Sequence, residues 1–409
     1  MHGGKRVGAG RRAISYCKKK HRRSIYVTED LYDRVMECEF DGVSSFSQNC
    51  SKLIELGLSV MNKSNSEYYS SDNILMINEE KAKMDSKQSN EKLKFIDLFA
   101  GIGGIRMGFE DDNTICVFSS EWDKFAAKTY EANFNEKPFG DITQIDEKEI
   151  PDHDVLLAGF PCQPFSNIGK REGFSHETQG TLFFDIIRIL KEKKPKMFLL
   201  ENVKGLLTSD KGRTYQVIME SLKELGYSVF DQVLDAQNFG LPQRRERVVI
   251  VGFHPNLKVN EFTFPMGDPT VRVPVNSILE QKDTGYTISK HLQDNYLFKK
   301  DDGKPQIVDF NSTIQVNTLV ASYHKIQRLT GTFVRDGETG IRLFTELELK
   351  RLIGFPEDFI VPVSRTQMYR QFGNSVAVPM IEAVAKEMKN TLIRANYPNE
   401  RVEENLVYS

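Results

Sequence analysis

The sequence predicts an α/β protein with a mostly parallel sheet, and three observations carry this prediction. From residue 93 onward, short apolar runs of strand length alternate with longer segments of helical periodicity. A glycine-rich turn, 100–104, follows directly on the first run, and glycine there lets the backbone approach a ligand closely. Reactive and charged side chains collect at the ends of the runs. In an open α/β sheet the carboxyl ends of the strands form the ligand-binding crevice, so a functional site is expected at that edge.

Length and composition are those of an ordinary globular protein with two or three domains. The chain has 409 residues, of which 39% are hydrophobic and 27% are charged. No apolar run is long enough to cross a bilayer, and the basic start lacks the apolar core of a signal peptide, so we expect a cytoplasmic protein without membrane contact. The five cysteines are scattered without a C-x-x-C pair, which predicts neither disulfides nor a metal site.

The first 23 residues form a basic arm. They carry nine Lys or Arg and no acidic residue, so the rest of a chain with a net charge of -2 must total -11. A glycine-rich cationic segment of this kind suits a polyanion, and we expect Arg22 and Arg23 to contact DNA. The alternative is a tail that only increases solubility.

Residues 24–61 have the pattern of a small DNA-binding module. A short alternating stretch predicts one strand, and two amphipathic helices follow it. So few elements cannot bury a core alone, and a second copy is expected to complete it. The order resembles the ribbon-helix-helix family, which implies a homodimer with Ser24, Tyr26 and Thr28 turned toward base edges. The alternative is a helical appendage packed on the main domain; the polar residues 62–92 are predicted to be a linker.

A cofactor site is predicted at the start of the main domain. The strand 93–99 runs into the glycine turn, and Glu121 ends the strand 116–120, twenty residues after Gly101. A carboxylate at this distance can accept hydrogen bonds from the ribose hydroxyls of a nucleoside cofactor. Asp141, one strand-helix unit further on, can take the exocyclic amine of an adenine. No phosphate-binding Gly-Lys-Ser/Thr follows, so S-adenosyl-L-methionine fits better than a dinucleotide.

The candidate nucleophile is Cys162. The apolar run 155–158 predicts a buried strand, and the prolines on both sides of Cys162 force a turn at its carboxyl end. A thiol in that place is presented to a substrate, whereas most free cysteines are small buried hydrophobic residues. The glycine-punctuated segment 167–174 is predicted to be a mobile loop over the site.

Further strands are predicted to bring charged groups to the same edge. The strand 196–200 delivers Glu201, and the strands 229–234 and 248–252 flank the arginine-rich segment 243–247. The alternatives are that Glu201 is a solvated loop acid and that the arginines form a surface charge run.

Seven short motifs occur in the order found in DNA (cytosine-5)-methyltransferases, and the chain resembles that family from about residue 94 to about residue 391. The motifs are Asp97–Gly104, Glu121-Trp122, Gly140–Ile142, Gly159–Gln163, Glu201–Val203, Gln243–Arg247 and Gln371–Val376. Any one of them can arise by chance, whereas seven in one order cannot reasonably do so. The resemblance implies a Rossmann-like S-adenosyl-L-methionine-dependent methyltransferase with a smaller target-recognition domain inserted before its last helices.

The resemblance also implies the chemistry, which takes place on a cytosine flipped out of the duplex. The Cys162 thiolate would add to C6, and the resulting enamine would attack the sulfonium methyl group. Glu201 would hold N3 and the exocyclic amine, Arg245 would stabilise O2, and Arg247 would position the cysteine loop. Gln163 completes the implied catalytic set. The implied cofactor-binding residues are Phe99, Gly101, Ile102, Gly103, Gly104, Glu121, Trp122, Asp141, Ile142, Pro161, Leu182, Asn374 and Ser375.

Recognition of the target sequence is expected in the long segment between the last two motifs. The stretch 317–323 resembles the loop by which the family's recognition domain meets DNA, with a core strand as the alternative. The implied DNA-binding residues are Thr318, Tyr323, Ser166 and Lys170, in addition to those of the N-terminal segments. The expected divisions are a basic arm 1–23, a ribbon-helix-helix-like module 24–61, a linker 62–92, a catalytic domain 93–253, a recognition domain 254–340, and a return to the catalytic domain 341–409.

Two other functions compete with the main expectation, which is a DNA enzyme of a bacterial restriction-modification system with a cognate endonuclease and autoregulatory operator binding. One is a tRNA cytosine-5 methyltransferase, disfavoured by the long segment 254–340 and the N-terminal module. The other is a non-catalytic DNA-binding regulator, disfavoured by the intact Cys162, Glu201 and Arg245.

Overall fold

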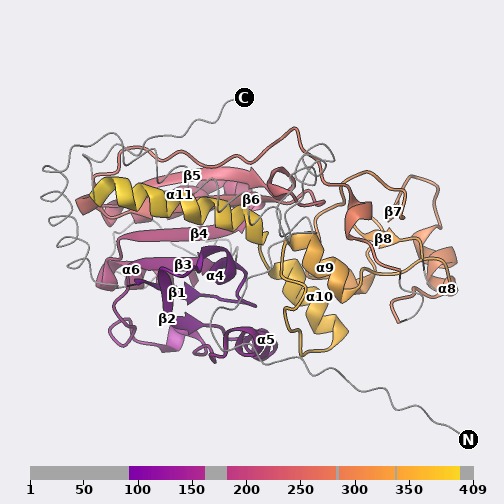
Figure 1. Ribbon diagram of the computed structural model, residues 1–409, viewed down its shortest axis with the longest axis horizontal. Coiled ribbons are helices and arrows are strands. Elements are labelled where there is room, and N and C mark those ends of the chain that lie inside the picture. Colours follow the sequence, from indigo (N-terminus) through magenta and orange to yellow (C-terminus); the bar gives the residue numbers. More distant parts are fainter. Residues whose placement is uncertain (1–91, 162–181, 282–284, 337–338, 397–409) are drawn as a thin grey trace, which may run out of the picture. The chain divides into compact units, whose positions relative to one another are not determined.

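The computed structural model describes residues 92–161, 182–281, 285–336 and 339–396, all within one compact unit, Glu91–Ser409. The basic arm, the ribbon-helix-helix-like segment, the linker, Cys162 and the predicted loop over the site lie outside the described residues. Figure 1 shows the arrangement of the described helices and strands.

A six-stranded sheet with the order β2-β1-β3-β4-β6-β5 organises the described part of the chain (Figure 1). The strands are β1 (Leu93–Leu98), β2 (Thr114–Ser120), β3 (Val155–Gly159), β4 (Met197–Val203), β5 (Ser228–Asp235) and β6 (Glu246–Phe253). The first four in the sheet order run parallel, and β6 runs antiparallel to both of its neighbours. The predicted mostly parallel α/β sheet is thereby confirmed.

The antiparallel direction of β6 has a direct consequence for the site. Arg247, near the start of β6, pairs in register with Val203 at the end of β4. The arginine-rich segment that precedes β6 therefore reaches the same edge of the sheet as the carboxyl ends of the parallel strands, which is the edge expected to bind ligands.

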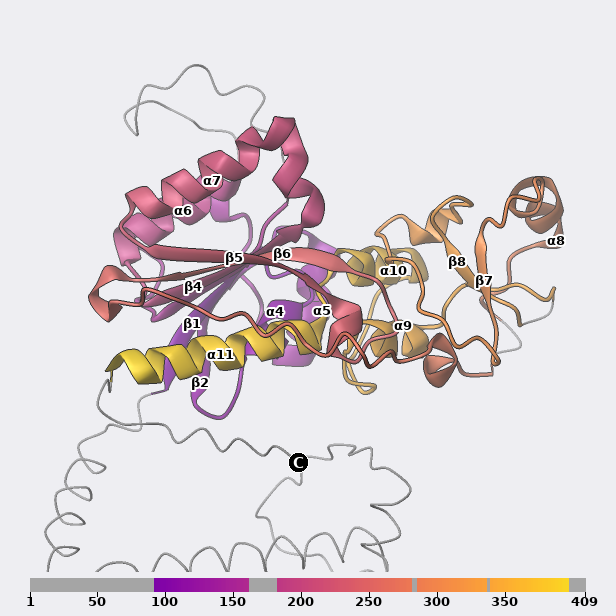
Figure 2. The same cartoon turned by 90° about the horizontal axis from the view of Figure 1, so that it is seen from above.

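Helices cover both faces of the sheet, as Figure 2 shows. On one face lie α4 (Gly104–Phe109) and α11 (Val378–Asn396), and on the other α6 (Leu182–Lys193) and α7 (Arg213–Glu224); α5 (Lys124–Phe134) follows β2. The central strands are apolar on both faces because both are covered. In β3, Leu157 packs in the cluster with Ile381 of α11, and Leu156 packs in the cluster with Ile186 of α6. Phe95 of β1 belongs to the same cluster, so α11 also packs against the first strand.

The remaining helices and strands lie to one side of the six-stranded sheet (Figure 1). They are α8 (Lys290–Leu292), β7 (Gln306–Val308), β8 (Thr332–Val334), α9 (Glu346–Ile353) and α10 (Arg365–Asn374). All of them except α8 contribute to a second hydrophobic core, the smaller core, which is smaller than the two clusters on the faces of the sheet taken together. Apart from Ile102 and Ala126, the buried members of this core lie between Val275 and Val378, whereas Val259 and Phe264 pack with the sheet. Hydrophobic packing thus groups α9 and α10 with the smaller part; the divisions expected at 254 and 340 stay predictions.

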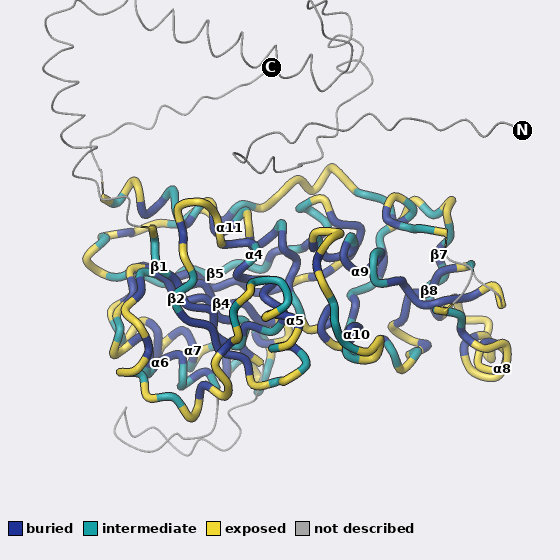
Figure 3. The backbone as a smooth tube through the Cα atoms, turned by 60° about the horizontal axis from the view of Figure 1, so that its bottom comes forward, coloured by how far each residue is buried: buried dark blue, intermediate teal, exposed yellow. Residues whose placement is uncertain are grey.

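Short helical turns punctuate the described connections. They are Ile142–Gln144, Lys204–Gly212, Ala236–Phe239, Pro255–Leu257, Val275–Ile278, Gln293–Leu297 and Tyr323–Lys325. Figure 3 shows that the strands of the sheet are mostly buried, whereas α8 is largely exposed. No helix in the four described ranges is long and apolar enough to span a membrane.

Candidate active site

A cavity of about 510 Å³ opens along the carboxyl edge of β1, β2, β3 and β4. Twelve of the predicted site residues line it: Phe99, Gly101, Ile102, Gly104, Glu121, Trp122, Pro161, Leu182, Glu201, Arg247, Asn374 and Ser375. The cavity therefore joins ten of the thirteen predicted cofactor residues to two of the predicted catalytic residues, although these residues are spread over nearly the whole main domain.

The glycine turn between β1 and α4 is shaped by its neighbours. Phe99, Gly101 and Gly103 all have positive φ values, of 54°, 57° and 84°. A Cβ at Gly103 would lie 2.1 Å from the ring of Phe134, and a Cβ at Gly104 would lie 2.6 Å from Ser375 Oγ. Glycine is thus required for the left-handed backbone and for close packing, and that packing draws residue 375 to the turn.

Glu121 fixes the same turn from β2. One carboxylate oxygen accepts from the Gly101 N–H and the other from the Asp123 N–H, both at 2.7 Å. Burial raises the pKa of Glu121, although these backbone hydrogen bonds act in the opposite direction. Next to it Trp122 lines the cavity with 78% of its surface exposed, which is unusual for an indole and leaves a flat apolar face available to a ligand.

Glu201 and Arg247 form a nearly buried ion pair in the cavity wall, with Arg247 Nε 2.9 Å from Glu201 Oε1. Burial raises the pKa of Glu201, against the lowering effects of Arg247 and Arg245. In register, Glu201 lies beside Gly159 at the end of β3. The carboxyl group is therefore held at the start of the loop that leads to Cys162.

Asn202 is a positioning residue to which the sequence assigned no role of its own. Its amide donates to the Phe160 carbonyl at 2.9 Å, and Asn202 is 3% exposed. It thereby fixes the backbone just before Pro161, which lines the cavity and is the last described residue before Cys162. Its place in the Glu-Asn-Val motif was the only sequence signal.

Arg245 has different surroundings from those expected. The sequence predicts that it faces the cytosine O2, yet it is 1% exposed and does not line the cavity. Its guanidinium donates to the carbonyls of Leu319 at 2.9 Å, Gly373 at 3.1 Å, and Ser375. The structure does not support a contact between Arg245 and the base, because these carbonyls occupy its terminal nitrogens; Arg247 is the arginine in the cavity.

The expected role of Tyr323 in DNA binding is also corrected. Its ring is 4% exposed and packs against Phe333, Phe344 and Tyr369. Its hydroxyl donates to the Thr332 carbonyl at 2.7 Å and accepts from the Phe344 N–H at 3.2 Å. The ring and the hydroxyl of Tyr323 are thus both used within the smaller core, although the stretch 317–323 is not the core strand of the alternative and Tyr323 begins a short helical turn.

Other predicted residues take up various positions. Asp141 is exposed and caps a short helical turn by accepting from the Thr143 N–H at 3.0 Å; it is not in the cavity wall. Ile142 packs in the core beneath the sheet at 2% exposure, and Gly103 shapes the turn without lining the cavity. The Thr318 hydroxyl donates to the Arg244 carbonyl at 2.5 Å.

Several candidates lie outside the described residues. They are Cys162, Gln163, Ser166, Lys170, Arg22, Arg23, Ser24, Tyr26 and Thr28. Within the described ranges, no group of three or more His, Cys, Asp or Glu is placed to hold a metal ion.

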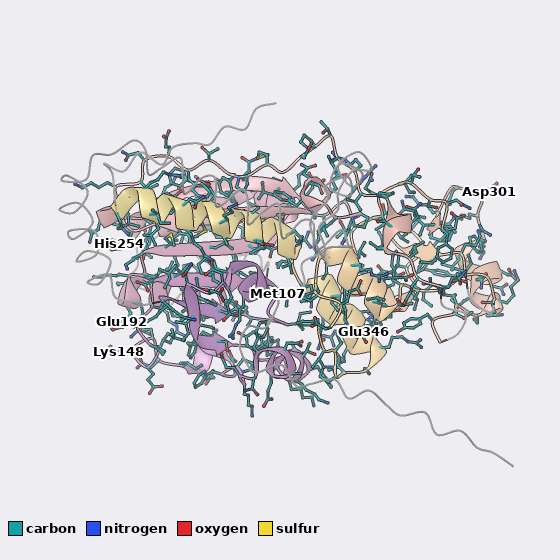
Figure 4. The ribbon with its side chains drawn as sticks, in the orientation of Figure 1. Met107, Lys148, Glu192, His254, Asp301 and Glu346 are labelled. Atoms are coloured by element: carbon teal, nitrogen blue, oxygen red, sulfur yellow. The ribbon has the colours of Figure 1, made fainter. Side chains whose placement is uncertain are left out.

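The cavity borders the smaller core as well as the sheet. Gln371 of α10 lines it and accepts from the Thr129 hydroxyl of α5 at 3.0 Å. Met107 of α4 packs against the smaller core, and Figure 4 shows it where the sheet approaches α10. In the same view Lys148, Glu192 and His254 lie toward the other end of the sheet, and Asp301 lies far out in the smaller part.

The fold and the cavity define an α/β enzyme that binds a nucleoside cofactor beside a buried acid. The chain belongs to the family of C-5 cytosine-specific DNA methylases, whose pattern it matches over residues 93–390. It is 66% identical over 403 residues to the Type II methyltransferase M.BsuFI of Bacillus subtilis, covering 97% of this chain and 98% of that protein. It is 56% identical over 317 residues to the Type II methyltransferase M.MspI of Moraxella sp, covering 77% of this chain and 75% of that protein.

Solved structures share the fold. A DNMT2 mutant of Spodoptera frugiperda superimposes with a TM-score of 0.60 at 24% identity, covering 74% of this chain and all of that one. Dnmt2 of S. pombe superimposes with a TM-score of 0.59 at 20% identity, over 73% of this chain and 99% of that one. The family and its Type II members make this protein a DNA (cytosine-5) methyltransferase of the kind found in restriction-modification systems, with S-adenosyl-L-methionine as its cofactor.

Proposed function

We propose that this enzyme methylates C5 of a cytosine flipped out of duplex DNA, through a covalent adduct with Cys162. The observation that carries the proposal is that the Glu201–Arg247 pair, the glycine turn, Glu121 and Trp122 all line one cavity. A base buried in a duplex cannot reach such a cavity, so the target nucleotide has to leave the stack.

The cofactor fits the turn side of the cavity. The residues that would hold it are the glycine turn, Glu121, Trp122, Leu182 and the segment 373–375. Each carboxylate oxygen of Glu121 accepts one hydrogen bond from the backbone. Each can accept a further one, from a ribose hydroxyl. Trp122 offers a face for an adenine to stack on. When bound, the cofactor supplies an electrophilic methyl group. The contact of Asp141 with the adenine amine stays a prediction.

Glu201 and Arg247 would act on the base itself. In the proposed reaction the Cys162 sulfur would bond to C6, and C5 would take the methyl group from the cofactor sulfonium, which leaves as the neutral thioether. A base would then remove the C5 proton, and the thiolate would leave C6. A protonated Glu201 would donate to N3 as electrons move into the ring, and burial favours that protonated form. Arg247 would stabilise negative charge on the pyrimidine.

The test has two stages. Bisulfite sequencing of DNA from a host that expresses the chain identifies the methylated sequence. A duplex with 5-fluorocytosine at that position should then trap a protein–DNA adduct, because fluorine cannot leave C5 as the proton does. Cys162→Ala should form no adduct and no product but retain DNA binding, since backbone contacts dominate affinity. Cys116→Ala is the matched control on β2, outside the cavity wall, and should trap normally. Turnover by Cys162→Ala close to that of the wild type would refute the covalent route.

The N-terminal segment and the partners complete the proposal. We infer that residues 1–60 form a dimeric module that binds an operator distinct from the methylated site and represses the enzyme's own gene. The basic arm and the unpaired strand-helix-helix pattern support this inference. A restriction endonuclease that cleaves the same unmethylated site would be the cognate partner.

A further inference from the structure

The segment that precedes β6 is bound along its length to residues 316–319. The Val316 N–H donates to the Pro242 carbonyl at 2.9 Å, and the Arg244 N–H donates to the Val316 carbonyl at 3.0 Å. The buried Gln243 side chain accepts from the Leu319 N–H at 2.6 Å. Arg245 adds the bond to the Leu319 carbonyl described above. This stretch of the predicted recognition loop is thus fastened to the strand that carries Arg247.

The Arg245 guanidinium also binds the segment 373–375, which lines the cavity. Its second terminal nitrogen donates to the carbonyls of Gly373 and Ser375, and Asn374 and Ser375 line the cavity. Gly373 touches the recognition loop directly: a Cβ there would lie 2.3 Å from the Ala321 nitrogen and 2.4 Å from the Val320 carbonyl carbon. The recognition loop and the cofactor-lining segment 373–375 therefore touch at Gly373. Arg245 donates hydrogen bonds to both of them.

The chemistry of this contact requires arginine. Among the described residues, no carboxylate forms an ion pair with Arg245, so its only hydrogen-bond acceptors there are neutral backbone carbonyls. Burial, and then the charge of Arg247, lower the pKa of Arg245 to about 9, which still leaves a cation at neutral pH. A planar guanidinium group can donate to carbonyls on two segments at once, whereas the donors of a lysine ammonium all lie on one nitrogen atom.

We propose that Arg245 is a positioning residue that couples the recognition segment 316–321 to the cofactor segment 373–375, so that binding of target DNA tightens binding of the cofactor. The inference rests on the proposed function, because it assumes that DNA contacts the segment 316–321 and that the cofactor contacts the segment 373–375. By linkage, the cofactor tightens binding of target DNA by the same factor.

The test measures the affinity of the demethylated product, S-adenosyl-L-homocysteine, by calorimetry with the full-length protein. It is measured with a duplex carrying the bisulfite-defined target and with a scrambled duplex. In the wild type the target duplex should tighten binding about tenfold, a typical allosteric coupling. In Arg245→Lys and Arg245→Met the ratio of the two affinities should fall to about one, because neither side chain bridges both segments. Gly373→Ala should lower the ratio from the other side by pushing the recognition loop away.

Arg328→Lys is the matched control. Arg328 is also a buried arginine that donates to backbone carbonyls, those of Leu297 and Lys300. It additionally forms an ion pair with Asp302, and all three partners lie within the smaller part. Its variant should keep the wild-type ratio. If Arg245→Met does not fold, Arg245→Lys and Gly373→Ala decide the question.

Two outcomes would overturn the inference. One is a wild-type ratio of one. The other is a set of Arg245 and Gly373 variants that bind the product more weakly but with an unchanged ratio, since a residue that only braces the pocket would lower both affinities equally. Methylation of the target by the wild type, read by bisulfite sequencing, separates these outcomes from a failure of the proposed function.

Discussion

At the scale of single residues, the site depends on how burial changes the charge of its carboxyl groups. Glu201 lies against Arg247 and near Arg245, and both cations favour its ionised form; burial acts more strongly and raises its pKa. A general acid is most useful when it keeps its proton near the working pH. The cavity thus combines an acid whose burial favours its protonated form with a neighbouring cation that can meet negative charge on the base.

We expect kcat/KM for methyl transfer to fall as the pH rises through the raised pKa of Glu201. The carboxyl group can donate to N3 only while protonated, so the activity is present below that pKa and is lost above it. The Cys162 thiolate cannot cause the fall, because its fraction increases with pH. Glu201→Gln should be about 100-fold less active and should lack the decline. A pH–rate profile on defined duplexes measures both, and a decline that persists in Glu201→Gln would assign it to another group.

Asp97 of β1 is a second buried acid, without a hydrogen-bond partner for either carboxylate oxygen among the described residues. Burial raises its pKa to about 8, against the opposing effect of Arg106 and with the help of Glu121. The unfolded chain loses this proton near its ordinary value of 3.8. Between the two values the folded state binds more protons, so the contribution of Asp97 to stability is full below about pH 4 and is lost as the pH rises toward 8.

Asp97→Asn should remove this pH dependence. We expect the variant to match the wild type near pH 4 and to exceed it by about 1–3 kcal/mol in free energy of unfolding above pH 8, because it has no charge to bury. Urea unfolding at several pH values measures the difference. Asp146→Asn, the same change at an exposed residue, is the control. Equal stability of Asp97→Asn and the wild type at high pH would show that the Asp97 carboxylate is accommodated in its charged form.

At the scale of elements, the turn between β1 and α4 is set by the end of β2. Glu121 gives one carboxylate oxygen to the turn and the other to the start of α5, where Asp123 caps the helix by accepting from two N–H groups at 2.9 Å. The turn itself has little freedom, because Phe134 and Ser375 fill the space beside its glycines. Strand, turn and helix therefore present one preformed wall to the cofactor.

Glu121→Gln tests that wall. An amide has a single acceptor oxygen, so its NH₂ group must face either the Gly101 N–H or the Asp123 N–H, donor against donor. We expect cofactor binding to weaken by about 1–3 kcal/mol, measured by calorimetry. Asp146→Asn, which alters a carboxylate that caps the Lys148 N–H outside the cavity, should bind as the wild type does. Unchanged affinity in Glu121→Gln would mean that the cofactor site lies elsewhere.

At the scale of the whole molecule, the active-site cavity lies where two cores meet. The sheet supplies Glu121, Glu201 and Arg247, and α10 of the smaller core supplies Gln371 and Asn374. Because neither part completes the cavity alone, a change in the smaller core can reach the chemistry through α10 and Arg245. All the described residues that line the cavity belong to the unit Glu91–Ser409.

Deletion of residues 1–60 should therefore leave methylation of the target sequence intact. The proposed module is needed for pairing and for operator binding, so the shortened chain should sediment as a monomer and lose a gel shift on the DNA upstream of its gene. Neutralising only Arg22 and Arg23 by Arg→Gln should weaken the gel shift while leaving the dimer intact, which separates DNA contact from pairing. Loss of catalysis on deletion, or a full-length monomer at about micromolar concentration, would contradict this assignment.

The sequence alone determined the order of the sheet-forming segments and much of the site. Apolar runs of strand length, a glycine turn and polar residues at strand ends are local signals, and they placed Glu121, Glu201 and the mostly parallel sheet correctly. The seven motifs identified the family because their order along the chain is itself information. Each of these inferences depends on a local pattern or on the order of motifs along the chain, and none requires knowledge of contacts between remote segments.

Only the tertiary structure decided which side chains face the cavity. Arg245 and Arg247 lie two residues apart on one segment, and the sequence cannot tell that one is clamped by carbonyls of Leu319, Gly373 and Ser375 while the other meets Glu201. Tyr323 likewise looked like a recognition residue until its ring was seen in the smaller core. The physical reason is that burial and hydrogen bonding arise between segments remote in sequence, here more than seventy residues apart for Arg245 and Leu319.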